Sequence, residues 1–367
     1  MRIGVPRESA SGERRVGLVP ESVGRLTKAG VGVRVQRGAG GPAFCTDDAY
    51  AAAGAELVDD AGAILGDCDV VVKVQKPSLA EADALREGVI LISLLPAATS
   101  ADVLERLTAR RVTSLALERV PRITRAQSMD ILSSQATVAG YKSVLIAAAA
   151  SPKLMPMLTT AAGSIPPAKA FVIGAGVAGL MAIATARRLG ASVSGFDIRA
   201  AAREQVLSLG ATFVGPEPVS DAEAAGGYAR AQTEDEQRKT MEALAAHIRD
   251  QDLVVTTAQI PGRPAPRLIT GAMVASMRAG AVIVDLAAET GGNCELTVPG
   301  ETRDVNGVQV IGALNVASTV PFHASVMFSK NVLTLLQHMI KDAAIAINLE
   351  DEIVGPMCLT HAGTTRS

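Results

Sequence analysis

The segment Gly174–Gly179 constrains the fold more than any other part of the chain. It reads Gly-Ala-Gly-Val-Ala-Gly, follows the apolar run Ala170–Ile173 and opens a helical pattern over Val177–Leu189. In a strand–turn–helix unit the first glycine permits a tight turn, the second lets the backbone approach a pyrophosphate, and the third lets the helix pack on the strand. Unpaired N–H groups at the helix start then face the phosphates. The residues expected to contact a dinucleotide here are Gly174, Gly176, Val177 and Gly179.

An acidic residue follows the next strand of this unit. The strand Ser192–Phe196 leads directly to Asp197, 18 residues after Gly179. A carboxylate at this place accepts hydrogen bonds from the ribose hydroxyls of NAD and repels the 2′-phosphate of NADP. Arg199 could instead suit a 2′-phosphate, but we weigh Asp197 more heavily and expect Arg199 to pack over the adenine. We therefore expect NAD(H) to be bound directly, with contacts from Asp197, Ile198 and Arg199.

Strand and helix patterns alternate along the chain, which is typical of parallel α/β sheets. Residues 1–135 form one series, and a segment rich in Pro and Gly, 151–167, precedes a second series. A helical pattern over about 324–349 is too long for a simple crossover, so we expect the chain to return to the first unit. The predicted fold class is α/β, with two Rossmann-like parallel-sheet domains and a cleft between them. The expected domains are 1–133 plus 318–367, closed by the C-terminal helix, and 134–317, the Rossmann NAD(H)-binding domain.

Charge and composition exclude several classes of function. The 367-residue chain has a net charge of −2 and only 2% aromatic residues, with no tryptophan. It therefore lacks the basic and aromatic surfaces that bind nucleic acid, and no apolar run reaches the roughly 18 residues of a membrane span. The four cysteines cluster neither with one another nor with the four histidines, so no metal site is expected. The N-terminus lacks a signal peptide, so we expect a cytoplasmic protein without a nucleic-acid partner.

A polar segment, Arg122–Gln135, joins the two series where a linker could be short. Gln127, Asp130 and Ser133 recur at helical spacing and would share one face of the helix start. An amide, a carboxylate and a hydroxyl on that face could hydrogen-bond the carboxamide and ribose of a nicotinamide, because interdomain clefts are where cofactors dock. The spacing alone leaves open the alternative of an ordinary helix N-terminus with its polar caps.

Six segments together resemble one known family. They are Arg122–Gln135, Gly174–Gly179, Asp197–Arg199, Gly226–Ala229, Thr256–Pro266 and Asp285–Cys294. Through these runs the chain is similar, over nearly its whole length, to the NAD(H)-binding component, domain I, of the proton-translocating nicotinamide nucleotide transhydrogenase, which is related to alanine dehydrogenase. The first and last of these runs are specific rather than generic.

The resemblance implies both a reaction and a set of partners. Domain I of the family binds NADH and passes a hydride to NADP⁺ on a separate domain III, and a membrane domain II couples that transfer to proton translocation. We therefore expect an oxidoreductase that is active only with its partner subunits, with NADP(H) held on the partner domain. Domain I is a homodimer in the family, so a homodimer is expected. With no membrane segment of its own, the chain would lie at the inner face of the membrane through those partners.

The resemblance also implies roles for single residues. The nicotinamide-side loop of the family matches Arg122, Gln127, Asp130 and Ser133, of which Gln127, Arg122 and Asp130 are the expected catalytic residues. Hydride transfer needs two aligned rings rather than a general acid or base, so these side chains would act by positioning. We expect Gln127 to be the most important of them, with Arg122 and Asp130 as a charged pair that orients it.

The remaining expected contacts come from two loops. Gly215–Thr233 is a loop of roughly 18 residues without an apolar period, a length that is usually functional or disordered. The mobile loop of the family matches Gly226, Gly227 and Tyr228 within it, so this segment is a candidate lid over the nucleotide. Gln259, in the run Thr256–Pro266, is also expected to contact the cofactor.

Two rival functions are considered. Alanine dehydrogenase needs an acid/base and a substrate clamp, but in this sequence Gln75 stands at the position of its catalytic Lys and Pro96 at that of its His. The related acid is Glu289 rather than Asp. The second rival is an NAD-binding sensor without catalysis, which nothing in the sequence excludes because the chain alone has no acceptor site for the hydride.

Overall fold

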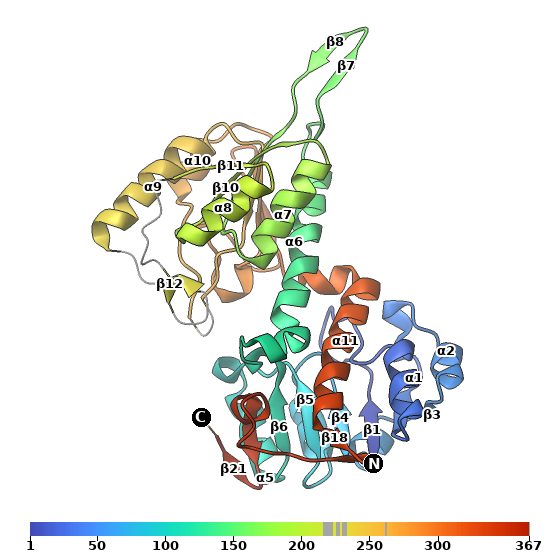
Figure 1. Cartoon of the computed structure of the whole chain (residues 1–367). Coiled ribbons are helices and arrows are strands. Elements are labelled where there is room, and N and C mark those ends of the chain that lie inside the picture. Colours follow the sequence, from blue (N-terminus) through green and yellow to red (C-terminus); the bar gives the residue numbers. More distant parts are fainter. Residues whose placement is uncertain (216–222, 225–227, 230–232, 261–262, 367) are drawn as a thin grey trace. The chain divides into compact units, whose positions relative to one another are not determined.

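The computed structural model describes residues 1–215, 223–224, 228–229, 233–260 and 263–366. The chain divides into two compact units: Met1–Gln135 with Ala317–Ser367, here called unit 1, and Ala136–Val316, here called unit 2 (Figure 1). Each unit contains one large sheet whose central strands are parallel. The predicted α/β class with two parallel-sheet domains is confirmed. The assignment of NAD(H) binding to the second domain remains a prediction.

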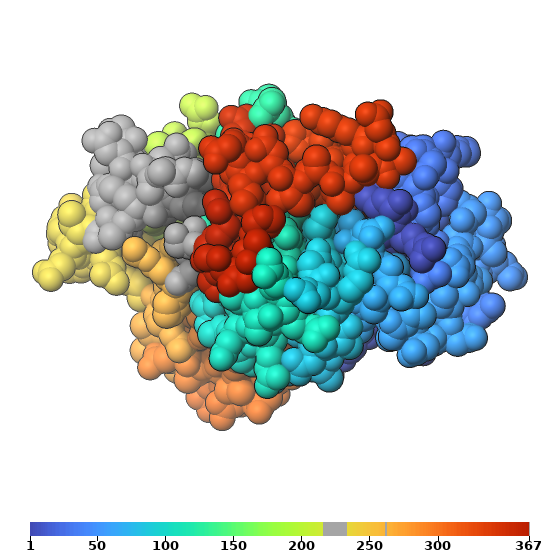
Figure 2. All heavy atoms as spheres, turned by 90° about the horizontal axis from the view of Figure 1, so that it is seen from below, coloured from blue at the N-terminus to red at the C-terminus, as the bar shows by residue number. Residues whose placement is uncertain are grey.

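Unit 1 is built on an eight-stranded sheet in the order β21-β20-β6-β5-β4-β1-β2-β3. The parallel strands are β1 (Arg2–Val5), β2 (Gly32–Gln36), β3 (Glu56–Val58), β4 (Val70–Val72), β5 (Ile90–Ser93) and β6 (Thr113–Ala116), and the antiparallel ones are β20 (Cys358–His361) and β21 (Thr364–Thr365). Because β20 pairs with β6, the C-terminal segment, red in Figure 2, lies beside the surface coloured green to cyan.

Helices cover both faces of this sheet. They are α1 (Pro20–Lys28), α2 (Asp47–Ala52), α3 (Gly62–Leu65), α4 (Leu79–Ala84), α5 (Ala101–Ala109), α11 (Pro321–Met339) and α12 (Val354–Met357). Along β4, Val70 and Val72 belong to one buried apolar cluster and Val71 to another, because successive side chains point to opposite faces. A strand buried on both faces is an unbroken apolar run, which is the signal visible in the sequence.

Unit 2 is built on a seven-stranded sheet in the order β11-β10-β9-β14-β15-β17-β16. Its strands are β9 (Lys169–Ile173), β10 (Ser192–Phe196), β11 (Thr212–Phe213), β14 (Leu253–Thr256), β15 (Val282–Asp285), β16 (Thr302–Val305) and β17 (Val308–Gly312). Of these seven described strands, only β16 runs antiparallel to its neighbour. The chain runs outward from β9 to β11 and then crosses to β14 on the other side of β9. The strand order therefore reverses at β9 and β14, and ligands bind beyond the carboxyl ends of strands at such a point.

The helices of unit 2 are α6 (Ile131–Ala150, which begins in unit 1), α7 (Val177–Arg188), α8 (Ala200–Ser208), α9 (Glu234–Ile248) and α10 (Gly271–Ala275). Helix α9 begins with a capping box, in which Thr233 and Glu236 satisfy each other's backbone N–H groups. No helix among the described residues is both long and apolar enough to cross a membrane.

Two parts of the chain differ from the expected pattern. Helix α11 ends at Met339 rather than near 349, because the chain turns back at Asp342 and Ala343, both with positive φ, to form the short hairpin β18 (Ile340–Lys341) and β19 (Ala344–Ile345). The segment rich in Pro and Gly contains a second hairpin, β7 (Leu158–Thr160) and β8 (Gly163–Ile165), whose residues are all exposed. It extends away from the rest of unit 2 (Figure 1).

The candidate lid lies largely outside the described residues. Gly226 and Gly227 are among the residues that the structure does not describe. The backbone of Tyr228 forms part of β13 (Tyr228–Ala229), which pairs antiparallel with β12 (Glu223–Ala224). The expected contacts of Gly227 and Tyr228 with the nucleotide remain predictions.

Candidate functional site

The glycine turn lies at the carboxyl end of β9, where the strand order reverses. Gly174 has a φ of +93°, which only glycine adopts without strain. Its N–H donates to the carbonyl of Phe196 at 2.8 Å, and its carbonyl accepts from Thr257 Oγ1 at 2.9 Å. A Cβ on Gly179 would lie 1.8 Å from the Gly174 carbonyl oxygen. The first and third glycines are therefore fixed by the protein's own packing.

Gly176 is different, because no described part of the protein requires its lack of a side chain. A Cβ on Gly176 would meet no described atom within 4 Å. Its backbone is extended, with φ −76° and ψ −166°, and it is the N-cap of α7 without a side-chain cap. The position is open to a ligand, next to the N–H groups at the start of a 12-residue helix. These features fit a pyrophosphate, as the fingerprint predicts.

The start of α7 is held in place by a second close approach. A Cβ on Gly140 of α6 would lie 2.1 Å from the carbonyl oxygen of Ala178, so the two helices touch backbone to backbone there. Val177, the first residue of α7, is 43% exposed. The helix terminus is therefore rigidly placed while its first residue remains accessible.

Asp197 is the acid expected to bind the ribose, and its carboxylate is almost entirely buried. Oδ2 accepts from the N–H of Ala175 at 2.8 Å, which joins the acid directly to the glycine turn. Arg199 donates to Oδ1 from its backbone N–H and from Nε, both at 2.9 Å, and to Oδ2 from Nη2 at 2.8 Å. Four hydrogen bonds fill the acceptor capacity of a carboxylate. Arg199 therefore folds back onto Asp197, and a ribose hydroxyl would compete with it for the same oxygens.

The loop after β14 is held by residues that sequence reasoning did not single out. Asp285, at the end of β15, is fully buried and accepts five hydrogen bonds, from Thr256 Oγ1, Ala287 N, Asn293 N, Cys294 N and Thr297 Oγ1. Asn293 in turn accepts from the N–H of Ala258 at 3.0 Å and donates to the carbonyls of Ala258 and Pro266, both at 2.8 Å. The exposed Gln259, an expected cofactor contact, follows Ala258 and donates to the carbonyl of Leu286 at 3.1 Å.

The segment that contains the other expected site residues lies in unit 1. It forms the 3₁₀ turn η4 (Thr124–Met129), in which Ala126 and Met129 are buried while Gln127 is exposed. Arg122 is also exposed. Asp130 follows the turn and caps α6, because Oδ1 accepts from Ser133 N at 2.9 Å and Oδ2 accepts from Ser133 Oγ at 2.6 Å. The structure thus brings Asp130 and Ser133 together as a helix cap, which was the open alternative, and leaves the side chain of Gln127 at the surface of its unit.

A buried cluster of charged and amide side chains stands where the rival enzyme would need its catalytic Lys. Arg15 donates twice to Glu13 and once to Gln135 Oε1, and Gln75 Nε2 donates to Glu13 Oε2 at 2.8 Å. Burial alone raises the pKa of Glu13, but the hydrogen bonds and charge of Arg15 outweigh it and lower the pKa to about 2. Gln75 is therefore a neutral donor in a closed network, and Pro96 is exposed at the start of η2 (Ala97–Thr99).

Beside this cluster, Lys73 is fully buried between two carboxylates. Its Nζ lies 2.8 Å from Glu81 Oε1 and 3.7 Å from Glu8 Oε2. Burial raises the pKa of Glu8 above its ordinary value despite the nearby Lys73. The ammonium of Lys73 is thus engaged by partners within the unit.

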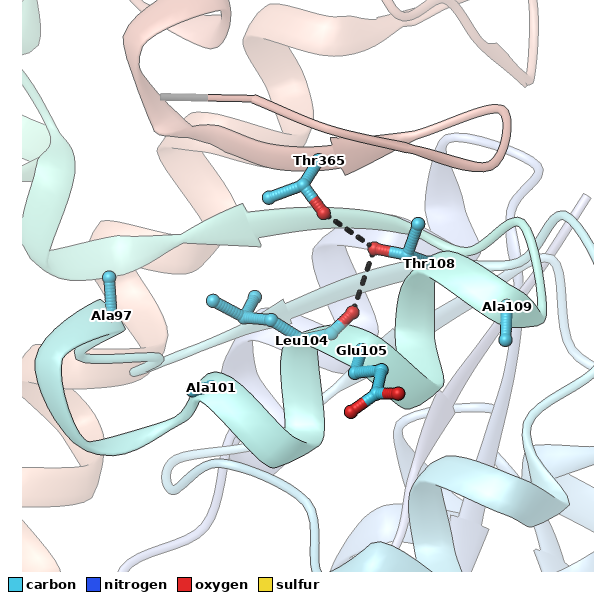
Figure 3. A pocket seen from close by; sticks show the side chains of 7 residues that line it. All are labelled: Ala97, Ala101, Leu104, Glu105, Thr108, Ala109 and Thr365. Carbon is cyan, nitrogen blue, oxygen red and sulfur yellow. Dashed lines mark hydrogen bonds between the residues drawn. The ribbon is translucent and has the colours of Figure 1, made fainter.

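A shallow cavity of about 550 Å³ lies elsewhere in unit 1, between α5 and β21 (Figure 3). Its lining is small and mostly apolar: Ala97, Ala101, Leu104, Glu105, Thr108, Ala109 and Thr365. None of these residues was predicted to bind a cofactor, and one carboxylate is the only ionisable group among them. We assign no chemistry to this cavity.

Comparison with known proteins covers the whole length of the chain. The family model described as alanine dehydrogenase/PNT, N-terminal domain, matches residues 4–139, and the corresponding C-terminal domain model matches 143–367. The first of the two polypeptides that form NAD(P) transhydrogenase subunit alpha in Rhodospirillum rubrum is 47% identical over 372 positions, which cover 99% of this chain and 97% of that protein. Alanine dehydrogenase from Mycobacterium tuberculosis is 33% identical and covers 82% of this chain and 76% of that protein.

A solved structure agrees with these matches. The crystal structure of transhydrogenase from Sinorhizobium meliloti superposes with a TM-score of 0.91 at 44% identity, and the match covers 100% of both chains. The resemblance noted in the sequence is therefore confirmed. The chain belongs to the alanine dehydrogenase/PNT family and, within it, is more similar to the transhydrogenase alpha subunit than to alanine dehydrogenase.

Proposed function

We propose that this chain is the NAD(H)-binding subunit of a proton-translocating NAD(P) transhydrogenase. It would pass a hydride between NADH and NADP⁺ bound on a partner domain, while a separate membrane subunit couples the transfer to proton movement. The observation that carries this proposal is the turn at Gly176, which is open to a ligand at the reversal of strand order, beside a buried acid that favours NAD.

Each part of the candidate site has a task in this proposal. Backbone N–H groups at the start of α7 would hold the pyrophosphate, and Gly176 would let it approach. Asp197 would accept from the ribose once Arg199 gives up part of its contact, which excludes a 2′-phosphate by charge repulsion. Gln259 would bind from the loop that Asn293 holds in place. When bound, the nicotinamide supplies the hydride, and this chain supplies its position.

No proton is transferred in this reaction, which agrees with the side chains present. Hydride exchange between two nicotinamide rings asks the protein only for close approach, alignment and exclusion of water. We propose that the exposed Gln127 positions the rings, with Arg122, Asp130 and Ser133 forming the nicotinamide-side loop around it. The segment that contains Gly227 and Tyr228 would close over the nucleotide.

We further propose that the chain is a homodimer, and the hairpin β7–β8 supports this. An isolated two-stranded hairpin is at best marginally stable in water. This one carries exposed apolar side chains, including Met157 at 65%, Ile165 at 45% and Leu158 at 38% exposure. Such a surface is expected to be covered by another protein. The membrane subunit and the NADP(H)-binding domain would then assemble with the dimer at the inner face of the membrane.

The hairpin offers a matched pair of variants to test the dimer. Leu158 pairs with Ile165 on one face of the hairpin, and Thr159 pairs with Ser164 on the other. In sedimentation experiments, replacing both Leu158 and Ile165 by Glu is expected to give monomers, while replacing both Thr159 and Ser164 by Glu should leave dimers. A wild-type monomer at micromolar concentration would refute this aspect of the proposal.

The reaction itself is tested by mixing the protein with NADH and an NADP⁺ analogue. Rapid transfer is expected when an NADP(H)-binding partner domain is added, and none without it. NADH oxidation by pyruvate and ammonia is expected to be undetectable, because Gln75 cannot act as a base. Tight NADH binding without transfer to a competent partner domain would instead favour a sensor.

A further inference from the structure

One residue of α11 holds the turn that carries Gln127. Asn331 Nδ2 donates to the backbone carbonyl of Ser128 at 2.7 Å. Ser128 directly follows Gln127, and both are exposed. A hydrogen bond to this carbonyl therefore acts on the exposed part of η4, where the side chain of Gln127 begins.

The buried side of the same turn is anchored in another way. Ala126 and Met129 lie in one apolar cluster with Phe328 and Val332 of α11, so helix and turn pack against each other. Arg125 also forms an ion pair with Glu352, but both side chains are more than half exposed and such pairs contribute little. The apolar contacts fix the height of the turn on the helix. The bond from Asn331 fixes the peptide next to Gln127.

The amide of Asn331 is not fully satisfied by its surroundings. Its Oδ1 is buried and accepts no hydrogen bond from any residue within the described ranges. A buried acceptor without a donor costs stability, and the cost can exceed what the bond made by Nδ2 returns. A side chain that is poor for stability at this position is consistent with a different task.

We propose that Asn331 is a positioning residue for hydride transfer, which acts by fixing the Ser128 carbonyl and through it the side chain of Gln127. This inference rests on the proposed function, in which Gln127 aligns the reacting rings. A shift of about 1 Å in a positioning group can cost up to about a hundredfold in rate. The role predicts a loss of transfer rate that is separate from nucleotide affinity and from stability.

The test compares Asn331→Ala and Asn331→Asp with a control, Lys330→Ala, at the neighbouring exposed position of the same helix. The Asp variant keeps the shape of the side chain but cannot donate to a carbonyl. For both Asn331 variants we expect hydride transfer to the partner domain to fall about 10- to 100-fold. The Kd for NADH should change less than about threefold, and the Tm of Asn331→Ala should stay within about 2 °C of the wild type. The control should resemble the wild type throughout.

A second measurement needs no partner domain. Within the turn, Ala126 N–H donates to the Ile123 carbonyl and Asp130 N–H donates to the Gln127 carbonyl. Hydrogen exchange of these two amides should accelerate at least about tenfold in the Asn331 variants, while exchange within α11 is unchanged. Unchanged exchange, or transfer at the wild-type rate, would overturn the inference. A wild-type protein that transfers no hydride would instead refute the proposed function, and the exchange result would still decide whether Asn331 holds the turn.

Discussion

Replacing Gly176 by alanine separates ligand binding from folding more cleanly than any other change in the glycine turn. The backbone of Gly176 is extended, so alanine adopts it without strain, and the new Cβ meets no described atom within 4 Å. Gly→Ala at a compatible position stabilises a protein by about 0.4–1 kcal/mol, because the unfolded chain loses freedom. For a unit of this size the Tm should be unchanged or higher by about 1–4 °C.

The effect on binding has the opposite sign. The added methyl group would occupy the space through which the pyrophosphate reaches the N–H groups of α7. If the phosphate withdraws and loses two charge-assisted hydrogen bonds of about 1.5 kcal/mol each, the loss is about 3 kcal/mol, or roughly a hundredfold in the Kd for NADH. Titration of NADH fluorescence together with a thermal melt measures both quantities on the same sample.

Gly179→Ala is the matched comparison. Its Cβ would lie 1.8 Å from the carbonyl oxygen of Gly174, so the strand–turn–helix unit must distort, at a cost of at least about 3 kcal/mol. We expect this variant to lose stability and binding together. If Gly176→Ala binds NADH as tightly as the wild type, the reasoning that places the pyrophosphate at this turn is wrong.

Three further predictions concern buried carboxylates. The lowered pKa of Glu13, about 2 against 4.5 when unfolded, contributes about 3 kcal/mol of stability that is complete above pH 4.5 and is lost as the pH falls toward 2. Urea unfolding between pH 3 and 6 should show this slope, and Glu13→Gln should abolish it. Asp285→Asn, which places an amide against several N–H and O–H donors, should lower the free energy of unfolding by about 2–5 kcal/mol, measured the same way. Asp197→Ala frees Arg199, so binding titrations should show a weaker affinity for NADH and a stronger one for NADPH, each by about tenfold. Equal affinities before and after that change would argue against Asp197 as the source of selectivity.

Much of the fold could be predicted because its signals are local. The buried strands of both sheets are short apolar runs, and the glycine turn needs Gly174 and Gly179 for steric reasons that the sequence carries directly. The hairpin β7–β8 was missed because it has no buried face, so its residues follow no apolar alternation. The end of α11 was placed too late because Asp342 and Ala343, which turn the chain with positive φ, are not typical residues for that conformation.

The candidate site was predictable only in part, and for a related reason. The polar residues of Arg122–Gln135 were visible, but the sequence could not decide between ligand binding and capping for Asp130, which in the structure caps α6. Asp285 and Asn293 were not assigned roles because most of their partners are backbone groups, which have no signature in the sequence. An acid directly after an apolar strand and before a run of small residues is the signal that could have pointed to Asp285.

Direct transfer of a labelled hydride tests the central claim. The protein is mixed with NADH that carries deuterium at the transferred position, the NADP(H)-binding partner domain and an NADP⁺ analogue, in ordinary water. We predict that the deuterium appears in the reduced analogue without loss to solvent, and that no NADH is oxidised when the partner domain is omitted. Label released into water, or oxidation of NADH by this chain alone, would contradict the account.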